Sequence, residues 1–453
     1  MDSDRARALF ALWLLFAINA MNFFDRQILG AVNEAIRKEW GLSDTQLGWL
    51  GTAFTLLYAA VGVPLGRAAD AWSRRKLLAI GLSLWSALTY ASGLCRGFWP
   101  LFAVRLGVGI GEAACAPTAS SLIGDLFRPL ERARALSIFM LGLPVGIALS
   151  YIVSGTIAHH YGWQAAFFVA GAPGLILAAF CLLIREPQRG LSERLKIGNA
   201  RRAGSPYLLV LGIPTMWWII ASGALHNFNM YAISFFLPAF LIRYHHVNLQ
   251  TAGFTSGIAI GLVGAVGMLL GGYLGDWLTQ RTANGRLLTA ALALTVSVPA
   301  SFLALQQPRG ALVRFMVFQG LASMMMYVYY ATVYSTIHDI VEPSLRGTAM
   351  AIYFCAMYVL GGSLGPIGTG WLSDSLARRS ASLAGFDLRG SAAIPEQFRA
   401  AGLHQAMYVI PGLGIVLVAV LFAGSRTVSK DMEKLQKWMR SLSPGKSGRM
   451  NHR

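Results

Sequence analysis

The sequence is poor in charged residues. Asp, Glu, Lys and Arg together make up 13% of its 453 residues, whereas 55% are hydrophobic. Soluble domains carry roughly 25% charged residues, because a surface that faces water has to be covered with polar groups. A chain this long with so little charge cannot cover such a surface. Its long, repeated low-charge stretches therefore indicate a protein whose solvent is largely the lipid bilayer.

Cysteines are also scarce. Cys95, Cys115, Cys181 and Cys355 lie in or beside apolar segments, and no two of them form a CxxC pair. This placement is typical of small core hydrophobes and not of a disulfide framework or a metal site. The sequence therefore predicts no structural disulfide, no metal centre and no cofactor.

Signatures of enzymes are missing. The chain contains no GxSxG, HExxH or Walker A motif. Pro444–Ser447 resembles the end of a phosphate-binding loop, but Arg440 stands where that loop needs its first glycine. His226 is the only histidine deep in an apolar segment. An intramembrane hydrolase or acyltransferase would have few groups to work with, so the sequence predicts a protein that is not an enzyme.

The net charge of +18 has a pattern that favours a membrane over nucleic acid. The basic residues form short runs between apolar segments, as they do in loops that set membrane orientation. The first apolar segment follows Arg5 and Arg7, is long, and lacks a small-residue cleavage site. We therefore expect it to be a retained first span and not a signal peptide.

Twelve windows are long and apolar enough for a membrane-spanning helix, which needs roughly 20 such residues. They lie near 8–32, 45–67, 76–96, 99–121, 134–157, 163–184, 207–241, 251–275, 286–306, 310–337, 345–372 and 404–424. The fold prediction is an all-α polytopic membrane protein with two six-helix bundles at 1–184 and 207–424. A basic linker at 185–206 joins the bundles, and a basic tail follows at 425–453, in which 431–439 can form a short surface helix.

The distribution of basic residues predicts the orientation. With the N-terminus inside, the inner segments hold 26 Lys and Arg residues and the outer loops hold 9. The positive-inside rule then places both termini in the cytoplasm, and we expect the plasma (inner) membrane as the location. The loop at 373–403 is an exception with four arginines, but long loops weigh less in this rule.

The two halves resemble each other. Gly66–Asp70 ends the second window and Gly272–Asp276 ends the eighth, at an offset of 206 residues. Arg105 and Arg314 enter the fourth and tenth windows at an offset of 209. Two markers at nearly the same offset indicate a duplicated six-helix unit. A third GxxxD, Gly370–Asp374, ends the eleventh window.

Four ionisable residues fall inside spans of the first half: Asp25, Arg26, Arg105 and Glu112. Each costs about 2.5–3.5 kcal/mol to insert, so it persists only when paired, hydrated or useful. Arg105 and Glu112 are seven residues apart and share a helix face. Glu112 is the first candidate for a proton-coupling site and Asp25 the second, with Arg26 and Arg105 as partners of the acids or of an anionic substrate. The alternative is a set of ion pairs that only holds helices together.

The second half is rich in aromatic residues and Met instead of charge. His226 and Asn227 lie in the seventh window and Tyr327 in the tenth, and together they are candidate substrate ligands. The alternative is ordinary helix packing. One charged half facing one aromatic half would suit an amphiphile with an anionic head.

A candidate cytoplasmic gate follows the second window. Asp70 at the end of the span can latch an opposing helix, with Arg74 and Arg75 in the short loop after it. Gly66, Gly272 and Asp276 complete the candidate gate at the two paired GxxxD sites. The alternative is a topology determinant made of surface charges.

At these residues the sequence resembles the major facilitator superfamily and, within it, the Spinster-like branch. The loop motif G-x-x-x-D-R-x-G-R-R is matched at Gly66, Asp70, Arg74 and Arg75, and departs at Ala71 and Ser73. Further resemblance lies in segments of the first, fourth and fifth windows: Asn22–Arg26, Arg105–Ala113, Ser121–Phe127 and Pro144–Gly146. The resemblance implies a proton-coupled carrier of lipid-like amphiphiles, such as lysophospholipids or sphingoid phosphates. The family's acids and bases would map onto Asp25, Arg26, Arg105 and Glu112.

Other functions stay open. Within the superfamily, the rival is a symporter of organic acids of the anion:cation type, which has a similar first span. A second alternative is uncoupled facilitation or lipid flipping, and a third is a membrane receptor or scaffold that does not transport. The expected partners are a small amphiphilic or organic anion, protons and membrane lipids, with a monomeric chain and no nucleic acid.

Overall fold

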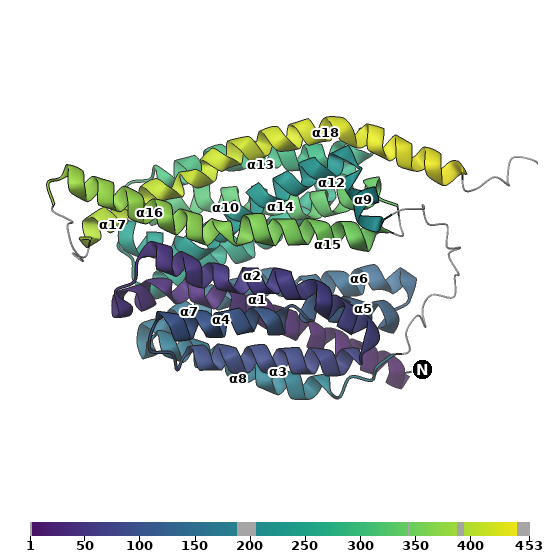
Figure 1. Ribbon diagram of the computed structural model, residues 1–453, viewed down its shortest axis with the longest axis horizontal. Helices are drawn as coiled ribbons and strands as arrows, with labels where there is room; N and C mark the ends of the chain where they lie inside the picture. The colour runs from purple at the N-terminus through teal and green to yellow at the C-terminus, as the bar shows by residue number, and fades with distance from the viewer. Residues whose placement is uncertain (1, 188–204, 343–344, 387–393, 442–453) are drawn as a thin grey trace, which may run out of the picture.

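The computed structural model describes residues 2–187, 205–342, 345–386 and 394–441. These residues are almost entirely helical, and no strand occurs among them. Helices are the expected solution in lipid, because a helix satisfies its backbone hydrogen bonds within one segment. Figure 1 shows two helical layers, with the first half of the chain in the lower layer and the second half in the upper one.

The eight helices of the first half make six segments of membrane-spanning length, which we call columns. The helices are α1 (Asp2–Trp40), α2 (Asp44–Ala71), α3 (Arg74–Ser92), α4 (Phe98–Glu112), α5 (Cys115–Leu126), α6 (Pro129–Met140), α7 (Gly142–Tyr161) and α8 (Trp163–Cys181). The pairs α4–α5 and α6–α7 each form one column. The break between α4 and α5 comes directly after Glu112, at the end of a run with Gly107, Gly109 and Gly111. Glycine weakens a helix interior, so the column breaks where the acid stands.

The second half repeats this plan after α9 (Pro206–Leu211). Its columns are α10 (Pro214–Tyr244), α11 (Leu249–Ser256) with the π-helix η1 (Gly257–Leu262) and α12 (Val263–Thr279), α13 (Gly285–Leu305), α14 (Leu312–Ile340), α15 (Arg346–Ala356) with the π-helix η3 (Met357–Gly362) and α16 (Leu364–Leu383), and α17 (Glu396–Met407) with α18 (Val409–Ser441). In the described part of the chain, ten columns are long and apolar enough to cross a membrane, and α2 and α3 complete the twelve.

The last helix is longer than expected from its apolar window. α18 continues to Ser441, so the polar residues after Ser425 extend the helix and do not start a separate surface helix. No glycine or proline interrupts 425–441, and the Asp431 carboxylate accepts hydrogen bonds from the backbone N–H (3.0 Å) and hydroxyl (2.6 Å) of Thr215. This contact ties the extension to the first turn of α10.

The two ends of the molecule differ in how the halves meet. We call the end where α1 begins and α18 ends the terminal end, and the end that carries α17 the distal end (Figure 1). The halves are in close contact toward the distal end, where α1 meets α10, α2 meets α16 and α7 meets α11. Glycine makes this approach possible, since a Cβ on Gly253 of α11 would stand 2.4 Å from the carbonyl oxygen of Tyr151 in α7.

Candidate functional site

The four ionisable residues predicted inside spans of the first half lie together between α1 and α4. We call Asp25, Arg26, Arg105 and Glu112 the charge cluster. Arg26 donates from Nε to a carboxylate oxygen of Glu112 at 2.8 Å, and the amide of Asn22 donates to the same oxygen at 3.0 Å. The side chain of Glu112 is fully buried and that of Arg26 is 5% exposed. A buried acid this far from water needs such a partner, because an unpaired charge inside the protein is strongly destabilising.

Arg105 does not pair directly with Glu112. Its Nη2 donates to the backbone carbonyl of Asp25 at 3.3 Å. Among the described residues, Arg105 Nε and Nη1 and both carboxylate oxygens of Asp25 have no hydrogen-bond partner within 3.5 Å. Asp25 and Arg105 are both buried. The second acid and the second base therefore carry unused hydrogen-bonding capacity next to a completed Arg26–Glu112 pair.

Arg26 also connects the cluster to aromatic residues and to the opposite half. Its guanidinium lies over the rings of Tyr58 (4.4 Å), Phe23 (4.8 Å) and Phe54 (5.1 Å), in the geometry of cation–π contacts. Nη1 reaches the hydroxyl of Tyr358 in η3 at 3.5 Å. π-helical turns are often found at functional sites, and this one presents Tyr358 to Arg26.

A chain of half-buried aromatic rings begins at Tyr58 of the first half and continues through Tyr358 in the second half. We call it the aromatic chain, and its members are Tyr58, Tyr231, Tyr330, Tyr334, Phe354 and Tyr358. Neighbouring rings are 5.1–6.5 Å apart between centroids. Two members of the aromatic chain, Tyr58 and Tyr358, contact Arg26 directly.

His226 closes this chain at its far end, on α10. Its ring stacks on Tyr329 at 4.0 Å and meets Tyr330 edge-on at 5.0 Å. Within the described residues, neither ring nitrogen of His226 has a hydrogen-bond partner, and the same holds for the amide nitrogen of Asn227. Tyr327 is buried against α12, where the missing side chain of Gly264 makes room for its ring.

Arg74 and Arg75 tie the first half together at the terminal end. Arg74 is buried and binds Asp125, Ser121 and Glu186. Arg75 donates to the carbonyls of Leu182 and Ile184 at 3.4 and 3.3 Å. Gly66 and Asp70 belong to α2, but their contacts lie outside the part of the chain that the structure describes.

The corresponding residues of the second half make a similar arrangement. Asp276 binds Arg286 at 3.0 Å, and Arg286 also binds Asp339 on α14. A Cβ on Gly272 would meet no atom within 4 Å. The repeat is incomplete elsewhere, since Arg105 is buried whereas Arg314 is exposed. The described bonds of Arg74, Arg75 and Asp276 thus lie within one half each.

The Glu186 contact predicts a pH-dependent contribution to stability. Burial raises the pKa of Glu186, but hydrogen bonds from Ser73 Oγ and from the backbone and guanidinium of Arg74 outweigh it and hold the pKa below its usual value. The stabilisation is therefore present at neutral pH and is lost as the pH falls through this lowered pKa. We expect Glu186→Gln to lower unfolding free energy by about 1–2 kcal/mol at pH 7 and by much less near pH 3.

Thermal unfolding of the purified protein at both pH values checks this. Glu433→Gln is the matched control, because Glu433 forms only an exposed pair with Lys437 and should change little. An equal loss for Glu186→Gln at both pH values would contradict the assigned ionic role.

The distal end is sealed by buried ion pairs that cross between the halves. Arg243, at the end of α10, binds both carboxylate oxygens of Asp44 at 2.8 Å and a carboxylate oxygen of Glu34 at 2.7 Å. Glu34 in turn binds Arg37, which reaches Glu396 of α17 at 2.8 Å. We call Glu34, Arg37, Asp44 and Arg243 the distal network. One arginine of the second half thus holds acids from two helices of the first half.

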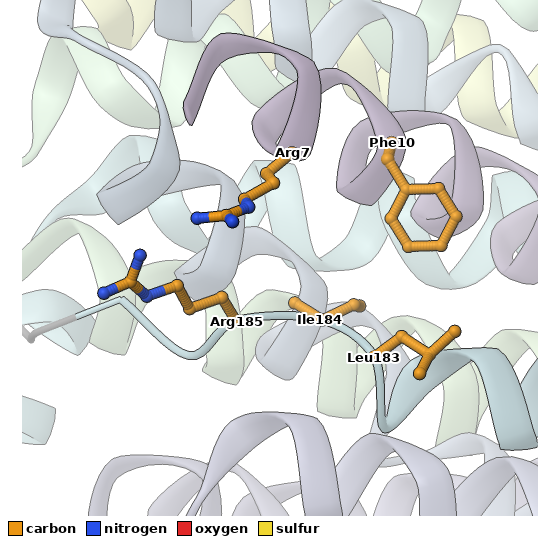
Figure 2. A pocket seen from close by; sticks show the side chains of 5 residues that line it. All are labelled: Arg7, Phe10, Leu183, Ile184 and Arg185. Atoms are coloured by element: carbon orange, nitrogen blue, oxygen red, sulfur yellow. The ribbon is translucent and has the colours of Figure 1, made fainter. Parts of the chain in front are cut away.

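The structure contains a cavity away from the charge cluster and another that Arg26 and Arg105 line. One of about 320 Å³ lies at the terminal end, between the first turns of α1 and the chain after α8, and Figure 2 shows the five side chains that line it: Arg7, Phe10, Leu183, Ile184 and Arg185. It contains no residue of the charge cluster. The other, of about 20 Å³, has room for roughly one water molecule and lies between the halves. Arg26, Gln27, Arg105, Tyr231 and Ser234 supply its polar lining.

A twelve-column helical fold in two related halves, with a buried charge cluster in the first half that contacts the second half through Arg26, is the architecture of a membrane transporter. Residues 15–366 match the family model of the Major Facilitator Superfamily, and the chain belongs to this family. Within the superfamily it is Spinster-like. The chain is 31% identical to the human protein spinster homolog 1 over 81% of this chain and 73% of that protein.

Two further comparisons agree. An MFS-type efflux pump of Mycolicibacterium smegmatis is 30% identical over 83% of this chain and 88% of the pump. The crystal structure of a bacterial homolog of the human lysosomal transporter Spinster, in an inward-facing and unoccupied conformation, superposes with a TM-score of 0.84 and 27% identity, covering 94% of this chain and 98% of that one. These relatives confirm the predicted fold class, the predicted branch and the prediction of a transporter that is not an enzyme.

The sequence did not reveal several residues that complete the site. Tyr58 and Tyr358 lie in ordinary apolar stretches, so nothing in their spacing marks them as neighbours of Arg26. Asn22 did carry a signal, because it stands in the Asn22–Arg26 segment, one helical turn before Arg26. The distal network has acids and arginines near span edges, which in sequence look like charges that set membrane orientation.

Proposed function

We propose that the protein is a proton-coupled secondary transporter of an amphiphilic anion of the lysophospholipid or sphingoid-phosphate kind. It would act in the plasma (inner) membrane as a monomer with both termini in the cytoplasm. The observation that carries the proposal is the fully buried Glu112, bound to an arginine that also reaches the opposite half. A titratable acid in contact with the moving interface can couple a proton to a conformational change.

In the proposed coupling step, an anionic substrate takes up hydrogen-bond donors of Arg26 or Arg105. The hydrogen bond from Arg26 favours the ionised form of Glu112. An anionic head group that takes the guanidinium of Arg26 or the unused donors of Arg105 removes that support, and Glu112 then takes up a proton. Asp25, buried in the same cluster, can share the proton, because interacting acids titrate as a pair. Proton and substrate are thereby linked without a covalent step.

The aromatic chain favours an amphiphile as the substrate. An anionic head would lie at the two arginines, where Tyr358 adds a hydroxyl donor. The body of the substrate would pack against the half-buried rings that lead toward His226, Asn227 and Tyr327. A small hydrophilic acid would use the arginines but leave this apolar surface uncovered.

The structure corresponds, in this proposal, to the inward-facing state. The support is the sealed distal network, the basic terminal end and the likeness to a Spinster homolog in an inward-facing conformation. In the opposite state, Gly66, Asp70, Arg74, Arg75, Gly272 and Asp276 would close the terminal end. The domain plan of two bundles with a cytoplasmic linker and tail belongs to the same proposal.

Uptake into proteoliposomes tests the function. We expect a radiolabelled lysophospholipid or sphingoid phosphate to be transported, and the transport to respond to an imposed pH gradient. Parallel assays with an aromatic acid and a sugar acid test the organic-acid alternative. Transport that ignores the gradient would contradict proton coupling and indicate a facilitator, whereas binding without transport would indicate a receptor.

A further inference from the structure

The third GxxxD motif, Gly370–Asp374, joins the two halves at the distal end. Asp374 lies on α16 of the second half, and its carboxylate binds the first turn of α2 in the first half. One oxygen accepts from the backbone N–H of Asp44 at 3.1 Å, and the other accepts from the N–H and the hydroxyl of Thr45 at 2.8 and 2.6 Å. Both Asp374 and Asp44 are buried. Three hydrogen bonds therefore converge on one acid from the opposite bundle.

The first turn of α2 is well suited to an acid. The first N–H groups of a helix have no acceptor within the helix, and the aligned peptide dipoles give that end a partial positive charge. A local capping box already uses Ser43 and Gln46, whose side chains each accept from the other's backbone N–H. Asp374 satisfies the two N–H groups between them, those of Asp44 and Thr45. The complete cap of α2 consequently exists only while the distal ends of the halves touch.

Gly370 provides the close approach that this cap needs. It lies four residues before Asp374, which puts both on the same face of α16. A Cβ at Gly370 would stand 2.2 Å from the carbonyl oxygen of Asp44. On the α2 side, a Cβ at Gly48 would stand 2.5 Å from the carbonyl oxygen of Pro366. The spacing of the motif thus combines a backbone contact with a carboxylate cap.

The same motif at Gly272–Asp276 binds differently. Asp276 is bound by Arg286 of its own half, and Gly272 faces open space. The contrast shows that the sequence motif alone does not create a bond between the halves. What distinguishes Asp374 is the free helix start placed opposite to it.

We propose that Gly370 and Asp374 form a latch that holds the distal end closed and is released each time that end opens. Asp374 is a positioning residue, because it holds α2 against α16 and contacts neither the charge cluster nor its aromatic lining. Next to the latch, Ser373 donates to Asp44 at 2.6 Å and Arg243 binds the same carboxylate. Latch and distal network therefore hold the same turn of α2.

Hydrogen–deuterium exchange of the full-length protein in lipid nanodiscs tests the latch. We expect Asp374→Asn to speed exchange in 249–257 and 150–158, where α11 meets α7, by about ten- to a hundredfold, the range that hydrogen bonds to a charged group contribute to an equilibrium. These segments do not touch Asp374, so a purely local cap would leave them unchanged. Thr45→Val removes one of the three bonds and should act in the same direction more weakly. Gly370→Ala should also speed exchange, since its methyl group pushes α16 away from α2.

Asp276→Asn is the matched control, with the same substitution in the same motif, and it should not speed exchange at the distal end. Faster exchange confined to 43–47 in Asp374→Asn would overturn the proposal, because it would reduce Asp374 to a local cap. If Asp374→Asn fails to fold, Thr45→Val and Gly370→Ala decide, and unchanged exchange in both would overturn it. The latch depends on alternating access and not on proton coupling. Wild-type transport that does not respond to a pH gradient would therefore contradict the proposed coupling and leave this test unaffected.

Discussion

Glu112→Gln is expected to abolish proton-driven accumulation of substrate while substrate binding and exchange continue. Glutamine keeps the shape and a hydrogen-bond acceptor for Arg26 and Asn22, which bind one oxygen of Glu112. It cannot titrate, so the site stays in its neutral form. A gradient of one pH unit supplies about 1.36 kcal/mol per proton, which corresponds to about a tenfold concentration ratio across the membrane. We expect this ratio to fall to about one in the variant, as measured in proteoliposomes with and without the gradient.

Two further variants separate the roles within the cluster. Asp25→Asn should reduce gradient-driven transport in the same way if the two acids share the proton. Arg105→Ala should weaken binding more than either acid variant, because it removes a candidate ligand for the anionic head. Uptake by Glu112→Gln that still responds to the gradient like the wild type would reduce Glu112 to a structural ion-pair partner.

Arg243→Ala is expected to destabilise the closed distal end by about 3–5 kcal/mol. Removing one partner of a buried ion pair leaves the other charge uncompensated, and here one arginine serves two acids. Asp44 would lose both of its 2.8 Å bonds from Arg243, and Glu34 would lose one of its two arginines. Thermal unfolding should begin at lower temperature, and hydrogen exchange at the start of α2 should become faster.

A double-mutant cycle identifies the source of the loss. Arg243→Ala combined with Asp44→Asn should be more stable than the sum of the two single losses predicts, because the uncompensated charge is removed. Arg281→Ala serves as the control, since Arg281 stacks on Trp277 of its own half. Strict additivity of the two single losses would contradict a direct pairing of Arg243 with Asp44.

The members of the charge cluster can be predicted from the sequence, but the pairing between them cannot. Asp25, Arg26, Arg105 and Glu112 stand out because charges are costly in an apolar span, and the structure places them together. The partner of Glu112 could not be read from spacing. Arg105 and Glu112 share a helix face, but the direct bond is made by Arg26 of another helix. Pairing between helices depends on their relative rotation and depth, which the hydropathy of either helix does not record.

The distal end shows the opposite case. Glu34, Asp44, Arg243 and Asp374 lie near span edges, where charges are inexpensive and therefore carry no signal of function. They become buried partners only because α1, α2, α10 and α16 converge there. The sequence indicates an aromatic second half, but it does not mark which rings form the aromatic chain. Tyrosines in an apolar stretch look the same whether they face lipid, a neighbouring helix or a binding site.

The amino-acid sequence alone establishes a polytopic helical membrane protein built from two related halves, with ionisable residues inside the spans of the first. Those features follow from hydropathy, repeat offsets and the cost of charge in lipid, which are properties of single segments. Helix packing sets the contacts between segments: Arg26 binds Glu112, Arg243 bridges two helices and Asp374 caps α2. These contacts join residues between 86 and 330 positions apart, and their formation depends on how whole helices pack.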